Sequence, residues 1–457
     1  MAEAGSTTTG EATLDPARIA AILDALAAGD APMVTALLDP LHPADIADLI
    51  ELITPPERRA LLALWGREID GEILSEIDEA IREEVIAGLA PEVLAEAVRE
   101  LDSDDVVDIL EDLEEPAQGR ILEALEDADR AAVEQSMAYP EYSAGRLMQR
   151  EVVTAPEHWT VGETIDHLRA AEWLPDQFYH VILVDPRMHP VGYATLGRIL
   201  SSRREVRLRD ITEETFRTIP VTMPDGDVAY QFNQYHLISA PVVDASGRLV
   251  GVVTIDDAMA VLDEEHEEDV LRLAGVGEEA SLSDGALETT RLRLPWLVIN
   301  LFTASLSAIV IAQFEATIET LVALAALMPI VASTGGIAGT QSLAVAVRGL
   351  ATRGLTAANA RRVFWREIGA GALNGLCLAL ILGLGGWLIF GDAKLGAVLG
   401  GAMIVNQMVA ATGGLLVPLT LNRLGFDPAL ASGTFVTTLT DVMGFFAFLG
   451  LATLVLI

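Results

Sequence analysis

The last apolar segment of the chain contains one ionisable side chain. Across residues 429–457 every residue is apolar or hydroxylic except Asp441, which lies in the stretch SGTFVTTLTDVMGFF. A carboxylate inside an apolar segment is costly unless it faces water, a cation or a hydrogen-bond donor. Two roles therefore stay open for Asp441: an acceptor in a path for cations, or a structural hydrogen-bonding group.

A dense run of acids lies nearer the N-terminus, in VLDEEHEEDVLRLAGVGEE, where Arg272 is the only nearby base. Repulsion between these carboxylates is not balanced within the run. The run is either a solvated acidic face or a site where a hard divalent cation such as Mg²⁺ bridges carboxylates of facing segments. Its acids are Asp263, Glu264, Glu265, Glu267, Glu268 and Asp269.

Charge is divided unevenly along the chain. The net charge is −38, but residues 291–457 hold only six acids and nine bases, so the first 290 residues carry −41. A field of that sign repels nucleic acid and concentrates cations, so we expect metal ions and no nucleic acid among the partners.

Five apolar segments, at 295–314, 321–347, 367–390, 395–421 and 429–457, are long enough to cross a bilayer, which takes about 20 residues. Arginines gather before the first segment and in the second and fourth joints. Because nothing near Met1 resembles a signal peptide, the positive-inside rule predicts that residues 1–290 are cytoplasmic and that the C-terminus lies outside. The Ala- and Arg-biased usage suggests a bacterial inner membrane.

The second apolar segment contains residues that weaken or crowd a helix: Pro329, Gly335, Gly336 and Gly339. These residues predict a broken or a tightly packed helix. Irregular backbone at membrane depth is tolerated where it lines a cavity, so the segment is a candidate for a pore wall. A small-residue packing face of the Gly-xxx-Gly kind is the other interpretation, and both can hold together.

The cytosolic half divides by its hydrophobic period. We expect a disordered N-terminus at 1–15, then a superhelical domain of amphipathic helix pairs at 16–147. An internal repeat follows at 148–262, where VILVDPRMHPVGYATLGRIL matches APVVDASGRLVGVVTIDDAM at an offset of 59 residues. An acidic connecting helix is expected at 263–290.

The repeat resembles a pair of CBS domains, α/β modules that regulate and bind adenine nucleotides or metal ions; an α/β spacer is the other interpretation. MPIVASTGGIAGTQSLAVAVRGLA and GFDPALASGTFVTTLTDVMGFF resemble the two signature stretches of the MgtE family of magnesium channels or transporters. The order of parts matches too. The resemblance implies a multidomain membrane protein with a cytosolic α-helical superhelical domain, a CBS pair and a five-helix transmembrane domain.

The resemblance also implies roles for particular residues. Asp441 is similar to the family's pore aspartate; Thr437 and Gly433, four and eight residues earlier, would share its face, and Gly335, Gly336 and Gly339 would line the same path. One departure is Ile337, where many members have Asn. Asp427 is similar to an acid that meets the connecting helix at a bound Mg²⁺. The implied regulatory Mg²⁺ ligands are the connecting-helix acids, with Asp244, Asp256 and Asp257 of the CBS pair and Asp102, Asp104, Asp105 and Asp108 of the helical domain.

One Asp441 brings one negative charge to a divalent ion, so two chains sharing a two-fold axis would balance it, which predicts a homodimer in membrane lipid. Mg²⁺ sheds water reluctantly, so we expect a hydrated ion. The expected function is Mg²⁺ uptake through a channel or transporter, closed when cytoplasmic Mg²⁺ binds the acidic domains.

Other function classes remain. A CBS-gated transporter of another divalent cation, such as Co²⁺ or Ni²⁺, would share these features, as would a membrane-anchored Mg²⁺ sensor without transport, although a sensor needs no charge in mid-segment. An enzyme is not expected, because the sequence contains no nucleophile–base constellation and no phosphate-binding glycine loop.

Overall fold

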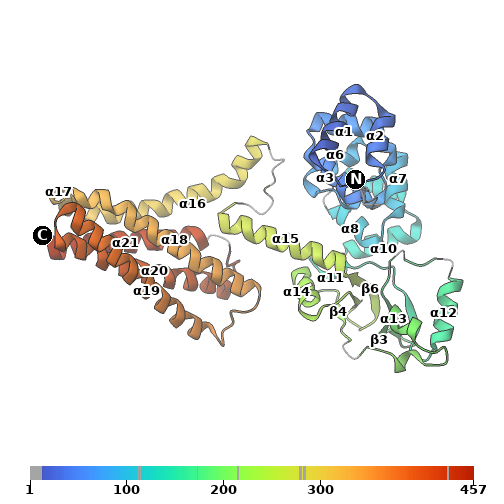
Figure 1. Cartoon of the computed structure of the whole chain (residues 1–457). Coiled ribbons are helices and arrows are strands. Elements are labelled where there is room, and N and C mark those ends of the chain that lie inside the picture. The colour runs from blue at the N-terminus through green and yellow to red at the C-terminus, as the bar shows by residue number, and fades with distance from the viewer. Residues whose placement is uncertain are drawn as a thin grey trace, which may run out of the picture. The chain divides into compact units, whose positions relative to one another are not determined.

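The computed structural model describes residues 13–457 apart from 112, 114, 172, 176, 214–215, 277–279, 281–284 and 430–431. The chain forms two compact units, Met1–Glu264 and Glu265–Ile457 (Figure 1). Most of the segment expected to be a disordered N-terminus, residues 1–12, lies outside the described residues. Asp15, at its end, accepts a hydrogen bond from Arg18 N at 2.7 Å and caps the first helix.

The first unit begins with a stack of short helices (Figure 1). Helices two apart in sequence pack together, as α3 with α5, α5 with α7 and α7 with α9. Their apolar faces form one continuous core, which confirms the predicted helical superhelix. The helices are α1 (Pro16–Ala28), α2 (Ala31–Leu38), α3 (Pro43–Leu52), α4 (Pro55–Trp65), α5 (Gly71–Ser75), α6 (Glu79–Gly88), α7 (Pro91–Glu100), α8 (Ser103–Glu111), α9 (Glu115–Ala124) and α10 (Asp127–Met137).

A side-chain donor from one helix repeatedly satisfies the carbonyls left free at the end of the helix before it. In each case the acceptors lie eight and five residues before the donor: Arg58 donates to Ile50 and Ile53, Gln118 to Leu110 and Leu113, and Arg130 to Leu122 and Leu125. Because the last carbonyls of a helix have no partner within it, this spacing closes each helix end against its successor.

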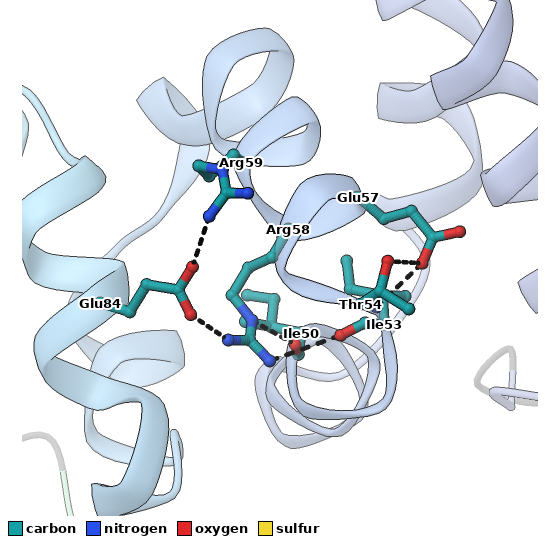
Figure 2. Close-up of polar contacts among 7 residues, drawn as sticks. All are labelled: Ile50, Ile53, Thr54, Glu57, Arg58, Arg59 and Glu84. Atoms are coloured by element: carbon teal, nitrogen blue, oxygen red, sulfur yellow. Dashed lines mark hydrogen bonds and ion pairs between the residues drawn. The ribbon is translucent and has the colours of Figure 1, made fainter. Parts of the chain in front are cut away.

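Figure 2 shows the first of these contacts. Arg58, only 3% exposed, donates from Nε to the Ile50 carbonyl at 2.9 Å and pairs with Glu84 at 2.5 Å. The neighbouring Arg59 also reaches Glu84, at 3.4 Å, but its side chain is 64% exposed. At the start of α4, Glu57 accepts from the Thr54 backbone and hydroxyl at 2.8 and 2.6 Å.

The internal repeat folds as two equivalent three-stranded sheets. Each has a parallel pair followed by an antiparallel pair, with the same irregularity in register, at Leu183/Val184 and Val242/Val243. The elements are α11 (Ala144–Leu147), β1 (Thr154–Pro156), α12 (Val161–Ala170), β2 (His180–Val184), β3 (Pro190–Thr195) and α13 (Leu196–Ser201), then β4 (Ile219–Pro220), α14 (Asp225–Tyr235), β5 (Ser239–Val243), β6 (Leu249–Thr254) and α15 (Ile255–Ala274). The strand, turn, strand, helix order predicted for each copy is confirmed.

Among the described residues of the second unit, five helices are long and apolar enough to span a membrane, as predicted. α20 packs against α18, α19 and α21 (Figure 1). It is the most buried of the five spanning helices described. The helices are α16 (Ala286–Gln313), the short α17 (Glu315–Thr320), α18 (Ala323–Ala351), α19 (Ala360–Phe390), α20 (Ala393–Leu424) and α21 (Ser432–Leu456).

The second spanning helix is unbroken. α18 runs through Pro329 and all three of its central glycines, so of the two predicted forms, broken or tightly packed, the structure has the tightly packed one. A Cβ on Gly335 would lie 2.1 Å from Asn406, and one on Gly339 would lie 2.6 Å from Val436. Neighbouring helices approach where the glycines leave room, which supports the helix around its proline.

We expect Arg58→Leu to loosen the helical stack locally. Glu84 stays hydrated, but the Ile50 and Ile53 carbonyls lose a buried donor, a cost of about 1–3 kcal/mol. Hydrogen exchange of the purified full-length protein should show protection of the amides of α3 and α4 falling by about 10- to 100-fold. Arg59→Leu is the matched control and should change protection by about twofold or less. Equal effects of the two changes would contradict this role for Arg58.

Candidate functional site

Asp441 lies on α21, beside the glycine-rich face of α18. A Cβ on Gly336 would lie 3.8 Å from the Thr437 methyl, and one on Gly339 would lie 3.4 Å from Thr440. These contacts bring the glycines of one predicted signature stretch against the residues of the other. The sequence alone did not predict that these two stretches pack against each other.

The Asp441 side chain is partly exposed, and within the described chain it has no hydrogen-bond or ion-pair partner. A structural role would need such a donor, so the geometry favours a carboxylate that meets water or a cation. Thr437, one turn earlier, donates its hydroxyl to the Gly433 carbonyl at 2.9 Å, and the bond leaves the hydroxyl oxygen free to accept. Gly433 lies near the end of α15, because a Cβ there would be 3.5 Å from the Leu273 carbonyl oxygen.

The end of α15 contacts Asp427 through an arginine. Arg272 donates to Asp427 at 2.8 Å and to Glu268 at 2.9 Å, while the other Asp427 oxygen accepts from Ala429 N at 2.7 Å. The guanidinium thus lies where the resemblance implies a metal ion between this acid and the connecting helix. Burial, and then the charge of Asp427, raise the pKa of Asp269.

The six acids predicted as ligands on α15 divide by exposure. Glu268 and Asp269 are partly buried near Arg272, whereas Asp263, Glu264, Glu265 and Glu267 are exposed. With Arg272 and Asp427, the two partly buried acids form a group that we call the α15 site. It carries two more negative than positive charges, the right imbalance for one divalent cation.

A second acidic group forms where α8 meets the start of α15, in the first unit. Burial, and then repulsion from Asp257, raise the pKa of Asp105 to about 7 and raise that of Asp104 well above its ordinary value. Burial also raises the pKa of Asp257 to about 6, although its carboxylate accepts from the Thr254 hydroxyl and backbone. Asp102 and Asp256 add to the repulsion at these groups. We call these five residues the α8 cluster.

Two other predicted ligands have structural partners. Asp108, which is 63% exposed, pairs with Arg82 at 2.9 Å. Asp244 closes the β5–β6 turn, accepting from Ser246 N at 2.8 Å and Arg248 N at 2.9 Å. Asp185 closes the equivalent turn of the first repeat in the same way. The repeated Val-Asp pair is therefore explained by the turn.

The acidic groups suit Mg²⁺ in donor type but are not arranged as a closed cage. Among the described residues no three His, Cys, Asp or Glu side chains converge as a metal site. Mg²⁺ commonly keeps several waters and takes only one or two carboxylates, so the α8 cluster and the α15 site have donors that fit it.

The sequence analysis missed two buried polar residues in the membrane unit. Asn406 and Gln407 of α20 are 0% and 2% exposed, and their amides donate to the Val331 and Thr334 carbonyls of α18 at 2.8 and 3.3 Å. The signal was present in the stretch MIVNQMVAA, where two carboxamides interrupt an apolar helix.

Comparisons with known proteins agree with the order of parts. Family models match as the MgtE intracellular N domain at residues 41–142, the CBS domain at 144–205 and 208–264, and MgtE, a divalent cation transporter, at 328–451. A magnesium transporter MgtE of Thermus thermophilus is 33% identical over 438 residues, which cover 95% of this chain and 97% of the relative. The chain belongs to the MgtE family.

Two further MgtE proteins show the extent of the likeness. The magnesium transporter MgtE of Bacillus subtilis is 27% identical over 91% of this chain and 92% of its own length. A crystal structure of the cytosolic domain of the Mg²⁺ channel MgtE in complex with ATP is 30% identical, covers 53% of this chain and 99% of its own, and has a TM-score of 0.49. This MgtE-family chain is thus an integral protein of a bacterial membrane, with a CBS pair, and its family is one of transporters, which is not an enzyme class.

The raised pKa values in the α8 cluster predict that the metal-free protein loses stability as the pH rises. The folded pKa values exceed the unfolded ones, so folding binds protons between about pH 4 and 7, and stability falls by up to about 1.4 kcal/mol per pH unit for each group. Scanning calorimetry of the full-length protein in EDTA should show this trend, and Asp105→Asn should flatten it. Glu123→Gln, at an exposed acid of α9, is the control. A transition that rises with pH across this range would contradict the assignment.

Proposed function

We propose that the chain carries Mg²⁺ across the membrane along a path bounded by α18 and α21, with Asp441 as its acidic group and Thr437, Gly433, Gly335, Gly336 and Gly339 along its wall. The observation that carries the proposal is a carboxylate without a partner, within the described chain, on a spanning helix that faces a glycine-lined neighbour. The names of the relatives point to the same ion.

Charge and hydration determine how such a path would hold the ion. One carboxylate does not balance a divalent cation, and two copies of Asp441 on a two-fold axis would, so we propose a homodimer. Hydrated Mg²⁺ would donate hydrogen bonds from its waters to carboxylate and carbonyl oxygens. Binding of this outer-sphere kind is weak enough to permit release.

Regulation would come from the acidic groups outside the path. With little cytoplasmic Mg²⁺, repulsion within the α8 cluster and among the acids of α15 disfavours the closed arrangement; bound Mg²⁺ neutralises them and favours it. The transported ion then inhibits its own entry, because it binds one conformation better than the other. Asp427 would take part through the α15 site. The negative electrostatic potential that attracts Mg²⁺ would also include contributions from Asp108, Asp244 and the four exposed acids of α15.

Three finer points belong to the same proposal. The arginine-rich joints support a cytoplasmic position for residues 1–290 and an external C-terminus. The CBS family match supports adenine nucleotide binding at the repeat. We keep domains at 16–147, 148–262 and 291–457. The connecting helix differs from the expected 263–290, because α15 begins at Ile255 inside the second repeat and ends at Ala274.

A second candidate is transport of another divalent cation, such as Co²⁺ or Ni²⁺. It rests on the broader description of the family model and on Ile337 in place of a polar side chain. Flux of each ion, alone and in competition, separates the two. A membrane-anchored Mg²⁺ sensor would bind the ion and show no flux.

Asp441→Asn should abolish most Mg²⁺ uptake. The amide keeps the shape of the side chain and removes its charge, so flux into proteoliposomes should fall by about tenfold or more. Flux is measured with chelator on the cytoplasmic side, so that gating does not mask the result. Asp392→Asn is the control, because it makes the same change of side chain at the start of α20, next to Lys394. Undiminished flux in folded Asp441→Asn would reject the path.

The ion pair of Arg272 with Asp427 predicts an effect of Arg272 substitution on gating. The guanidinium holds Asp427 without metal, so Arg272→Gln should raise flux at low cytoplasmic Mg²⁺ by about two- to tenfold while closure at high Mg²⁺ persists, because the remaining acids attract Mg²⁺ more strongly. Arg272→Lys should restore part of the contact. Arg291→Gln, an exposed arginine of α16, serves as the control. Identical Mg²⁺ dependence in Arg272→Gln and wild type would show that this ion pair does not bias the gate.

A further inference from the structure

Asn406 occupies the point where three spanning helices meet. Its carboxamide lies between two glycines, since a Cβ on Gly335 of α18 would be 2.1 Å from Nδ2 and one on Gly444 of α21 would be 2.9 Å from it. The side chain is fully buried. Each glycine therefore provides space for this one carboxamide.

The hydrogen bonding of Asn406 is incomplete. Nδ2 donates to the Val331 carbonyl of α18 at 2.8 Å, whereas Oδ1 has no partner within the described residues. A buried acceptor without a donor costs free energy, and in an apolar interior a leucine of similar shape would avoid that cost. The residue is thus poorly explained by stability alone.

The carbonyls that follow Pro329 receive an unusual set of donors. Thr334 donates its hydroxyl to the Ile330 carbonyl at 2.6 Å, Asn406 donates to Val331, and Gln407 donates to Thr334 at 3.3 Å. Two of the three donors come from α20. The turn of α18 that carries Gly335 and Gly336 is therefore fixed to α20 by side chains.

The other contact of the carboxamide lies close to the acid of the proposed path. Gly444 is three residues after Asp441, so the two lie on neighbouring positions of the same helical face. Asn406 consequently contacts both helices that bound the proposed path. It contacts α18 at Val331 and Gly335, and it contacts α21 at Gly444, about one turn from the Asp441 carboxylate. A shift of the carboxamide would change the separation of the glycine face and Asp441.

We propose that Asn406 is a positioning residue for the ion path: it sets the register between the glycine turn of α18 and the Asp441 turn of α21, and so controls ion selectivity. The inference rests on the proposed Mg²⁺ transport. It assigns Asn406 no direct contact with the ion. An amide suits the task because its single planar group donates to one helix while it packs against the other.

The test pairs two substitutions with matched controls in the full-length protein. Asn406→Leu removes the amide at nearly constant shape, and Asn300→Leu makes the same change at an exposed site on α16. Gly444→Ala keeps the amide but presses on it, whereas Gly385→Ala adds a methyl group on α19 with no atom within 4 Å. Thermal unfolding, hydrogen exchange of α18, Mg²⁺ flux and the ratio of Mg²⁺ to Ca²⁺ flux are measured for each.

We expect Asn406→Leu to keep or raise the unfolding temperature, to speed exchange in the 331–338 segment, and to lower Mg²⁺ flux by about tenfold with a reduced Mg²⁺/Ca²⁺ ratio. Gly444→Ala should act in the same direction, and both controls should match wild type. Unchanged flux and ratio in Asn406→Leu would overturn the proposal, as would a loss of flux that follows a fall in unfolding temperature, because Asn406 would then be structural only. If Asn406→Leu does not fold, Gly444→Ala decides by the same criteria. Wild-type protein without Mg²⁺ flux would reject the proposed function, while the exchange data would still show whether Asn406 holds α18.

Discussion

The membrane unit depends on how closely α20 approaches its neighbours. In lipid, apolar side chains gain little by meeting each other, so association relies on tight packing and on hydrogen bonds between helices. Glycines supply the packing on both sides of α20: a Cβ on Gly371 of α19 would lie 2.9 Å from the Gln407 carbonyl, and one on Gly414 of α20 would lie 2.6 Å from the Gly339 carbonyl. The position of α18 follows from these contacts, and with it the position of the glycine face that we propose as one side of the ion path.

The sequence was sufficient for the architecture, because the architecture depends on periodic and compositional signals. Five long apolar runs, a 59-residue repeat and short amphipathic helices each correspond to an element of the structure. Asp441 was singled out for the same reason, because a single charge contrasts with its apolar surroundings, and its role in the path stays a prediction. Between a broken and a tightly packed α18 the sequence did not decide, because the local propensities of Pro329 and the glycines do not show the packing against α20, and that packing accompanies a continuous helix.

What escaped the sequence analysis is the pairing of residues distant along the chain. Asp105 and Asp257 each lie in an ordinary acidic helix start, and only the fold brings their repulsion together. Arg272 was recognised as the one base of its run, but its partner Asp427 lies beyond several spanning helices. Asp244 has a structural role that the sequence analysis did not name, since its carboxylate closes a turn of the repeat.

The α8 cluster and the α15 site differ in how strongly their charge depends on bound cations, and this difference suits them to different roles in gating. Burial and mutual repulsion raise the pKa values of Asp104, Asp105 and Asp257 in the α8 cluster, so its charge depends on the pH of the solution and, in the proposed function, on bound Mg²⁺. The α15 site contains Arg272, whose charge is always present, so its contact with Asp427 does not require a metal ion; in the proposed function Mg²⁺ would add to this contact. In such a switch the α8 cluster would determine the Mg²⁺ concentration at which the path closes. Arg272 would keep α15 in contact with Asp427 when little Mg²⁺ is present.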